Sequence, residues 1–184
     1  MTKRREEALR LLEEAELLFS AEQVGDAVAR VAGDITARIK DEFPVVLSVM
    51  GGAVVFTGQL LPLLRFPLEF GAIEVTRYNN DVQGRDITWR LPPRDNVRDR
   101  LVLVVDDILD EGVTLAAIHK RLTEMGARKV MSAVFADKDI GHAKPVAADF
   151  VGVKVPNRYV FGFGMDAYGL WRNLPAIYAL RADK

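Results

Sequence analysis

Hydrophobic positions along the chain alternate between helical and strand spacing. The first forty residues predict helix, in which Ser20 and Gln23 form a capping box: the serine accepts from the Gln23 amide while Gln23 reaches back. Beyond the box, apolar residues recur on one helical face, at Val24, Ala27, Val28, Val31, Ile35 and Ile39. Apolar runs of strand length follow at residues 44–50, 68–76, 101–105 and 130–136. The first of these, PVVLSVM, is continuous and predicts a strand covered on both faces.

The order of these elements indicates the fold class. Glycines after residue 50 favour a helix from residue 53, and a second helix is predicted from about Thr114 to Met125. The order strand, turn, helix, strand between residues 101 and 136 is a βαβ unit, which implies an α/β fold with a mostly parallel twisted sheet flanked by helices. With 184 residues and no convincing linker, residues 1–184 are expected to form a single domain.

A polar segment interrupts this pattern between residues 78 and 100. It is rich in turn formers and contains one short apolar alternation, at residues 87–91. A polar excursion of this length inside a compact domain is typical of a functional lid or a disordered insert.

Composition narrows the classes of protein. The chain is 49% hydrophobic and 28% charged, with a formal net charge of −1, which gives no broad attraction to nucleic acid. Cysteine is absent, so disulfides and cysteine metal sites are excluded. The charged N-terminus lacks the apolar core of a signal peptide, and no run is long enough to span a bilayer. We therefore expect a cytoplasmic protein without nucleic-acid or membrane partners.

The stretch LVLVVDDILDEGVTL, residues 101–115, ends a buried strand in four carboxylates, at Asp106, Asp107, Asp110 and Glu111. Capping of the next helix explains one or two of them, but not four. DDILD also matches the DDxxD motif of prenyl-chain synthases, whose aspartates hold magnesium bound to a diphosphate. That motif lies on a helix of an all-helical protein, whereas here it follows five β-prone residues, so the context favours another interpretation.

Residues 102–115 resemble the signature of the type I phosphoribosyltransferases, which is a hydrophobic strand, two acids, two apolar residues and Asp-x-Gly-x-Thr. The resemblance implies the fold of that family, with Asp106 and Asp107 holding the ribose hydroxyls of phosphoribosyl pyrophosphate (PRPP). The turn that follows would wrap its 5-phosphate, through Asp110, Glu111, Gly112, Val113 and Thr114. Diols donate well to carboxylates, and a glycine turn at a helix N-terminus directs several N–H groups at one anion.

This copy departs from the common pattern, in which threonine stands at the position of Glu111 and a basic residue often at that of Val113. Glu111 beside a phosphate would repel it unless its side chain points away. We therefore expect phosphate binding to depend on backbone amides and the Thr114 hydroxyl more than on charge.

Three further stretches resemble the hypoxanthine-guanine branch of the family. In the first, the resemblance implies a pyrophosphate site at Met50, Gly51 and Gly52, formed by backbone amides and often through a cis peptide. Many members have lysine at the position of Met50, and a simple strand-to-helix turn is the alternative interpretation of the glycines. In the second, Arg77 and Tyr78 correspond to the Ser-Tyr pair of a mobile lid that closes over the active site.

The third stretch resembles a small purine-binding hood, formed mainly by residues 138–184. Singly, a tyrosine in an apolar run is usually core, and a lysine after a strand is usually solvated. In family order, the resemblance implies that Lys138 donates to the purine O6, Tyr159 stacks on the base and the Val160 backbone meets the base edge. It also places Asp166 near the purine C2 edge and the metal, and Arg172 on pyrophosphate.

The implied reaction is purine salvage, in which N9 of hypoxanthine or guanine displaces pyrophosphate from C1 of PRPP to give IMP or GMP. Asp110 is the candidate general base. Mg²⁺ is the expected cofactor, held by Asp106, Asp107 and Asp166 partly through water or substrate. The alternative is a PRPP-sensing regulatory protein of the same fold, which would need a basic surface. Two apolar faces within residues 9–39 favour a homodimer or homotetramer.

Overall fold

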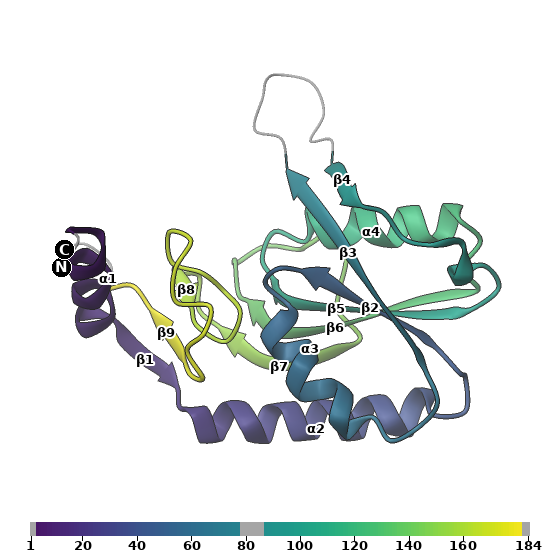
Figure 1. The fold of residues 1–184 in the computed structure, drawn as a ribbon, viewed down its shortest axis with the longest axis horizontal. Helices are drawn as coiled ribbons and strands as arrows, with labels where there is room; N and C mark the ends of the chain where they lie inside the picture. Colours follow the sequence, from purple (N-terminus) through teal and green to yellow (C-terminus); the bar gives the residue numbers. More distant parts are fainter. Residues whose placement is uncertain (1–2, 78–86, 182–184) are drawn as a thin grey trace.

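The computed structural model describes residues 3–77 and 87–181, and they form two sheets (Figure 1). The larger sheet has six strands in the order β4-β3-β2-β5-β6-β7, and all pairs in it are parallel except β3 with β4. Its strands are β2 (Val45–Met50), β3 (Glu69–Arg77), β4 (Ile87–Leu91), β5 (Leu101–Leu109), β6 (Lys129–Lys138) and β7 (Phe150–Val155). The α/β class and the mostly parallel sheet are confirmed.

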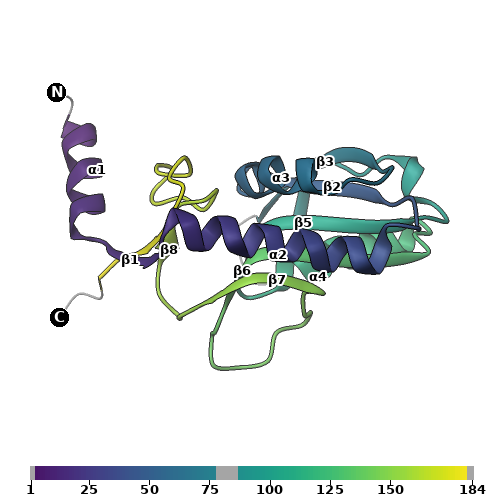
Figure 2. The same ribbon diagram turned by 90° about the horizontal axis from the view of Figure 1, so that it is seen from below.

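Helices cover both faces of this sheet. In Figure 1, α4 (Val113–Glu124) lies above the strands and α2 (Ala21–Ile39) below them, and Figure 2 shows α2 crossing in front of the strands. Side chains of β2 alternate between two cores: Val46 packs in the cluster that includes α2, whereas Val45 and Leu47 pack in the cluster that includes α4. This confirms a strand buried on both faces. The connections between the strands also contain α3 (Val54–Leu60) and the 3-10 turns η1 (Leu61–Leu63) and η2 (Asp95–Val97). No helix in the described ranges is both long and apolar enough to cross a membrane.

The smaller sheet lies beside the larger one and has the order β1-β9-β8 (Figure 1). It joins β1 (Glu16–Phe19) to β8 (Val160–Phe161) and β9 (Ile177–Ala179), with α1 (Lys3–Glu14) at its outer side. The prediction of helix throughout the first forty residues is therefore wrong at residues 16–19, because pairing with β9 overrides local helical propensity. Helix α2 begins after Ser20, where the predicted capping box with Gln23 is confirmed.

Strand β5 extends four residues beyond the predicted end at Val105. Its ladder with β6 continues until Leu109 pairs with Asp137, whereas its ladder with β2 stops where Ser48 pairs with Val105. Asp106 and Asp107 therefore lie within the last part of the strand, whereas Asp110 and Glu111 follow its end. Strands β3 and β5 flank β2 on opposite sides, so the strand order reverses between β2 and β5. The carboxyl ends of these two strands form the switch point of the sheet, where α/β proteins bind ligands.

Candidate active site

A cavity of about 290 Å³ lies at this switch point. It brings together residues from three parts of the chain, which are Met50, Gly51 and Gly52, then Asp106, Asp107, Asp110, Gly112 and Thr114, and finally Asp166 and Arg172. The residues assigned to PRPP and to pyrophosphate therefore share one space. Glu111 and Val113 do not line it.

A second cavity of about 250 Å³ adjoins the first and shares Asp107, Asp110 and Asp166 with it. It is also lined by the other residues assigned to the purine, Lys138, Tyr159 and Val160. The two cavities are therefore neighbours, with Asp110 on their common wall.

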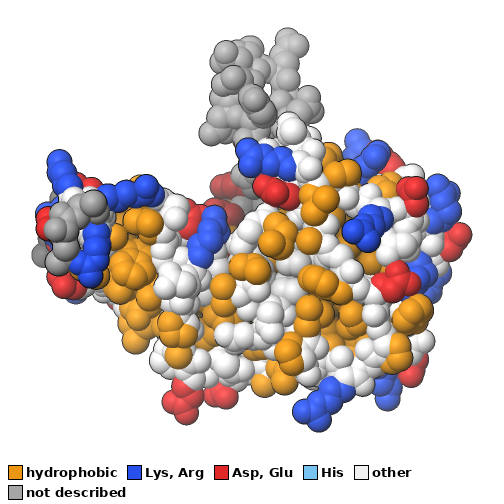
Figure 3. All heavy atoms as spheres, in the orientation of Figure 1, with side chains coloured by type: hydrophobic (Ala, Val, Ile, Leu, Met, Phe, Trp, Pro, Cys, Tyr) orange, Lys and Arg blue, Asp and Glu red, His pale blue; other side chains and the backbone are white. Residues whose placement is uncertain are grey.

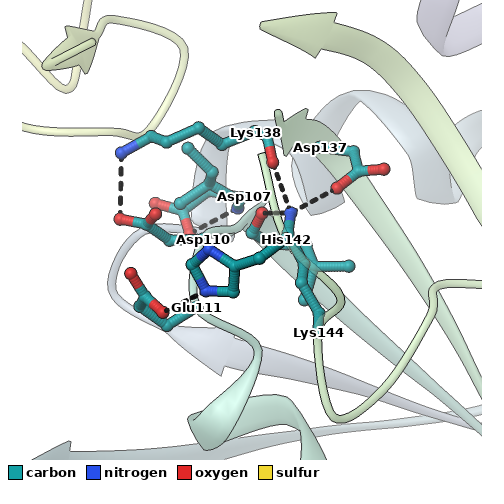
Figure 4. Close-up of polar contacts among 9 residues, drawn as sticks. Asp107, Asp110, Glu111, Asp137, Lys138, His142 and Lys144 are labelled. Carbon is teal, nitrogen blue, oxygen red and sulfur yellow. Dashed lines mark hydrogen bonds and ion pairs between the residues drawn. The ribbon is translucent and has the colours of Figure 1, made fainter. Parts of the chain in front are cut away.

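The turn before α4 has the geometry of an anion site. Gly112 is the N-cap residue, has φ of +77°, and provides no side chain to cap the helix. This left-handed conformation favours glycine, and the first N–H groups of α4 can donate to a ligand. The Glu111 carboxylate lies 3.6 Å from His142 Nε2, so the acid is turned toward that histidine (Figure 4).

Asp107 and Gly52 fit closely at the other end of the cavity. A Cβ atom on Gly52 would lie 1.9 Å from Asp107 Oδ2, so glycine is what allows this carboxylate to approach the backbone. Burial raises the pKa of Asp107, and interactions with Asp106 and Arg172 partly oppose the rise. The peptide bond between Met50 and Gly51 is cis.

Lys138 and Asp110 form an ion pair at the boundary of the two cavities (Figure 4). The distance from Lys138 Nζ to Asp110 Oδ2 is 2.9 Å, and the lysine side chain is only 13% exposed. The purine O6 donor and the general base proposed from the sequence are therefore in direct contact. Lys138 is a cation that can donate to an oxygen, and Asp110 is an acceptor that can take a proton. The pair suits a purine that carries an oxygen and loses a proton.

Asp166 and Arg172 face the cavity from the turn that follows β8. Arg172 Nη2 lies 2.7 Å from Asp166 Oδ1, and Arg172 Nη1 donates to the Gly164 carbonyl at 2.6 Å. The other Asp166 oxygen accepts from the Gly169 amide at 2.7 Å. These bonds fix the arginine at the wall of the first cavity.

Two residues near the site carry no signal in the sequence. Tyr168 stacks on Tyr159, with ring centroids 5.6 Å apart, and Lys144 is bonded to the ends of β5 and β6. No periodicity or motif marks either residue. Of the expected lid, Arg77 ends β3 and residues 87–91 form β4, while Tyr78 and the segment up to residue 86 lie outside the described residues.

Carboxylate oxygens are the ligands that Mg²⁺ prefers, and Asp106, Asp107 and Asp166 all line the first cavity. Within the described ranges, however, no group of three or more His, Asp and Glu side chains could by itself hold a metal ion. The donor set fits a magnesium ion only if substrate or water supplies the other ligands.

Comparisons with known proteins agree with this geometry. Residues 15–168 match the phosphoribosyl transferase domain family. The chain is 32% identical to the hypoxanthine-guanine-xanthine phosphoribosyltransferase of Tritrichomonas foetus, over 90% of this chain and 91% of that protein. It is 30% identical to the hypoxanthine-guanine phosphoribosyltransferase of Bacillus subtilis, over 90% and 92%. A crystal structure of a Bacillus anthracis hypoxanthine-guanine phosphoribosyltransferase superimposes with a TM-score of 0.81 at 25% identity, covering 90% of this chain and 97% of that one.

Proposed function

The chain belongs to the phosphoribosyl transferase family, and we propose that it transfers the phosphoribosyl group of PRPP to N9 of hypoxanthine or guanine. The products are IMP or GMP and pyrophosphate, which makes the reaction a step of purine salvage. The observation that carries the proposal is the contact between Lys138 and Asp110, on the boundary between the sugar-phosphate cavity and the purine cavity.

On the sugar-phosphate side, amides of residues 110–114 and the Thr114 hydroxyl donate to the 5-phosphate. Asp106 and Asp107 accept hydrogen bonds from the ribose hydroxyls. The backbone of residues 50–52, together with Arg172, holds the leaving pyrophosphate. These assignments are supported by the single cavity that all of these segments line.

On the purine side, Lys138 donates to O6 while Asp110 takes the proton that the purine loses as N9 forms its bond to C1. Tyr159 supplies a ring face for stacking, and the Val160 backbone meets the edge of the base. Adenine carries an amino donor at C6, so it would oppose the Lys138 ammonium with a second donor. The arrangement therefore selects purines that bear oxygen at C6.

Mg²⁺ is the cofactor that we propose for this site. Asp106, Asp107 and Asp166 would hold it, with the remaining ligands supplied by PRPP and water. When bound, the ion neutralises the pyrophosphate and stabilises it as a leaving group. Arg172, which lies 4.0 Å from Asp107, supplies the protein's own positive charge for the same group.

A PRPP-sensing regulator of the same fold is not favoured. The chain carries 25 basic and 26 acidic residues, and both signs are interspersed on the face drawn in Figure 3. A regulator that binds nucleic acid needs a basic surface, and a regulator needs no assembled purine site. Here the residues assigned to the purine line one cavity.

A homodimer or homotetramer in the cytoplasm is also proposed. The outer side of the smaller sheet exposes Leu9 of α1 and Leu17 of β1, at 37% and 53%. Apolar side chains of this kind favour association with a second copy. Light scattering of the purified protein measures the size of the assembly, and a monomer at all concentrations would contradict it.

The test of the function is a panel of bases. The protein is mixed with PRPP, Mg²⁺ and hypoxanthine, guanine, xanthine or adenine, and both the nucleotide and the released pyrophosphate are measured. Hypoxanthine or guanine is expected to exceed adenine in kcat/KM by about 10⁴-fold, because a site built around one buried polar contact rejects its reversal strongly. Comparable rates with adenine, or no pyrophosphate with any base, would contradict the proposal.

A further inference from the structure

Lys144 lies in the loop between β6 and β7, and its side chain turns back to the carboxyl ends of β5 and β6 (Figure 4). Its Nζ atom donates to the carbonyl of Leu109 at 2.7 Å, to the carbonyl of Lys138 at 2.6 Å and to Asp137 Oδ1 at 2.6 Å. The side chain is 12% exposed. An ammonium has three donors, so these three acceptors saturate it, and charge-assisted bonds of this length are strong.

The three acceptors belong to the ends of two adjacent strands. Leu109 and Asp137 are register partners at the end of the ladder between β5 and β6, and Lys138 is the last residue of β6. The Leu109 carbonyl is part of the peptide bond that leads to Asp110. Lys144 therefore holds the backbone at both residues from which the ion pair of the purine site extends.

The charged side chains at these strand ends form two separate ion pairs. Successive side chains of a strand point to opposite faces, so Asp137 and Lys138 diverge. The Asp137 carboxylate meets Lys144, while the Lys138 ammonium meets Asp110 (Figure 4). Loss of the Lys144 ammonium would leave a partly buried carboxylate and two strand-end carbonyls without this donor, next to the residues assigned to the purine.

We infer that Lys144 is a positioning residue for the purine half of the reaction, which sets the spacing between Asp110 and Lys138 through the ends of β5 and β6. This inference rests on the proposed function. Transfer to a purine requires both side chains to face the same base, and misplacement of a reacting group by about 1 Å can lower the rate by about 10²-fold.

The sugar-phosphate half contacts a different part of the same residue. A Cβ atom on Gly112 would lie 3.3 Å from Lys144 Cβ and 3.2 Å from Pro145 Cδ, so the turn at residues 110–114 (the phosphate turn) packs against the side-chain stem of Lys144 and the ring of Pro145. Lys144→Met keeps the stem and this packing but removes the three donors. The substitution therefore separates the effect on the purine from any effect on PRPP.

The experiment compares Lys144→Met, Lys144→Arg and the control Lys154→Met, which changes an exposed lysine on β7. Lys144→Met should lower kcat/KM for hypoxanthine by about 10–10²-fold while KM for PRPP stays within about twofold. Lys144→Arg keeps the charge and should recover part of the loss, and Lys154→Met should behave as the wild type. Unchanged hypoxanthine kinetics in Lys144→Met, or an equal rise of both KM values, would overturn the inference.

A second measurement needs no substrate. Amide hydrogen exchange in residues 108–111 and 136–139 should be faster in Lys144→Met than in the wild type, with little change elsewhere. Equal exchange at these strand ends would also overturn the inference. If Lys144→Met does not fold, Lys144→Arg carries both measurements. If the wild type forms no nucleotide, the proposed function fails, and hydrogen exchange alone decides whether Lys144 fixes the strand ends.

Discussion

The two halves of the candidate site are built in different ways. The sugar-phosphate half comes mainly from one continuous segment, residues 106–114, which ends β5, turns at Gly112 and starts α4. The purine half is assembled from residues far apart in the sequence, at Asp110, Lys138 and Tyr159. The first half depends on local geometry and the second on long-range contacts. Substitutions in the purine half should therefore weaken the binding of the base and lower the selectivity among bases.

The supports of the two halves differ in the same way. The phosphate turn is held by the β5 ladder and by the backbone conformation of Gly112. The purine half is held by ion pairs and by bonds to carbonyl groups, such as the pair of Lys138 with Asp110 and the bonds of Lys144 to the ends of β5 and β6. Substitutions can therefore be chosen that act mainly on one half, whereas Asp107, Asp110 and Asp166 line both cavities.

The largest effect is expected for Asp110→Asn, because this residue lies on the wall common to both cavities. An amide cannot accept the purine proton, so kcat should fall by about 10²–10⁴-fold, while binding of PRPP is retained. Steady-state kinetics and calorimetry with PRPP measure the two quantities. Glu111→Gln is the control, since its side chain faces His142. A variant that cannot bind PRPP but keeps its rate at saturation would make Asp110 a binding residue.

Lys138→Met should give the next largest effect and confine it to the purine half. The variant keeps the stem but loses the donor to O6, so the preference for hypoxanthine over adenine should fall by about 10²-fold or more. KM for PRPP should change little, because Lys138 does not line the first cavity. Ratios of kcat/KM for the two bases provide the measurement, and an unchanged ratio would remove Lys138 from the specificity contact.

Gly52→Ala should act on the other half. The new Cβ would displace the Asp107 carboxylate, which lies 1.9 Å from its position. KM for PRPP should rise by about tenfold, which is the size of one lost hydrogen bond to a charged group. KM for hypoxanthine should rise less, although Asp107 lines the second cavity as well as the first. Gly58→Ala in α3 is the control, because a Cβ there meets nothing within 4 Å. A larger rise for hypoxanthine than for PRPP would contradict the division into halves.

The same difference explains how much of the site the sequence revealed. Asp106, Asp107 and the turn up to Thr114 stand out as a candidate site because they are consecutive residues between a strand and a helix, and the family resemblance assigns them to PRPP. The larger sheet was predicted for a similar reason, since its central strands are continuous apolar runs. The end of β5 was misplaced because its pairing with β6, which no local pattern shows, carries the strand into the acids.

The purine half could be predicted only through a family resemblance. The sequence identified neither Lys144 nor Tyr168 because the positions of their loops depend on packing between distant segments. Strand β1 was taken for helix for the same reason, since its partner β9 lies at the other end of the chain. Four to six residues of strand carry too little periodicity to be recognised without their partners.

The smallest effect is expected behind the sugar-phosphate half, at His119 on α4. Burial lowers the pKa of His119 from its ordinary value of 6.5, and Asp149 opposes this only in part. The unfolded chain therefore takes up the proton at a higher pH than the folded protein does. The contribution to stability is complete above about pH 6.5 and is lost as the pH falls below that value.

His119→Leu should remove this part of the pH dependence, because the side chain no longer titrates. Denaturant unfolding at about pH 8 and about pH 5.5 measures it, and the difference in the free energy of unfolding between the two values should be smaller than in the wild type. His142→Leu is the matched control, since it changes the chain's other histidine, whose side chain is 62% exposed. At pH 8, KM for PRPP and KM for hypoxanthine should stay unchanged in both variants, because neither histidine lines the first or the second cavity. An equal reduction of the pH dependence in His119→Leu and His142→Leu would contradict the prediction, because burial of His119 would then not be the cause of the pH-dependent stability.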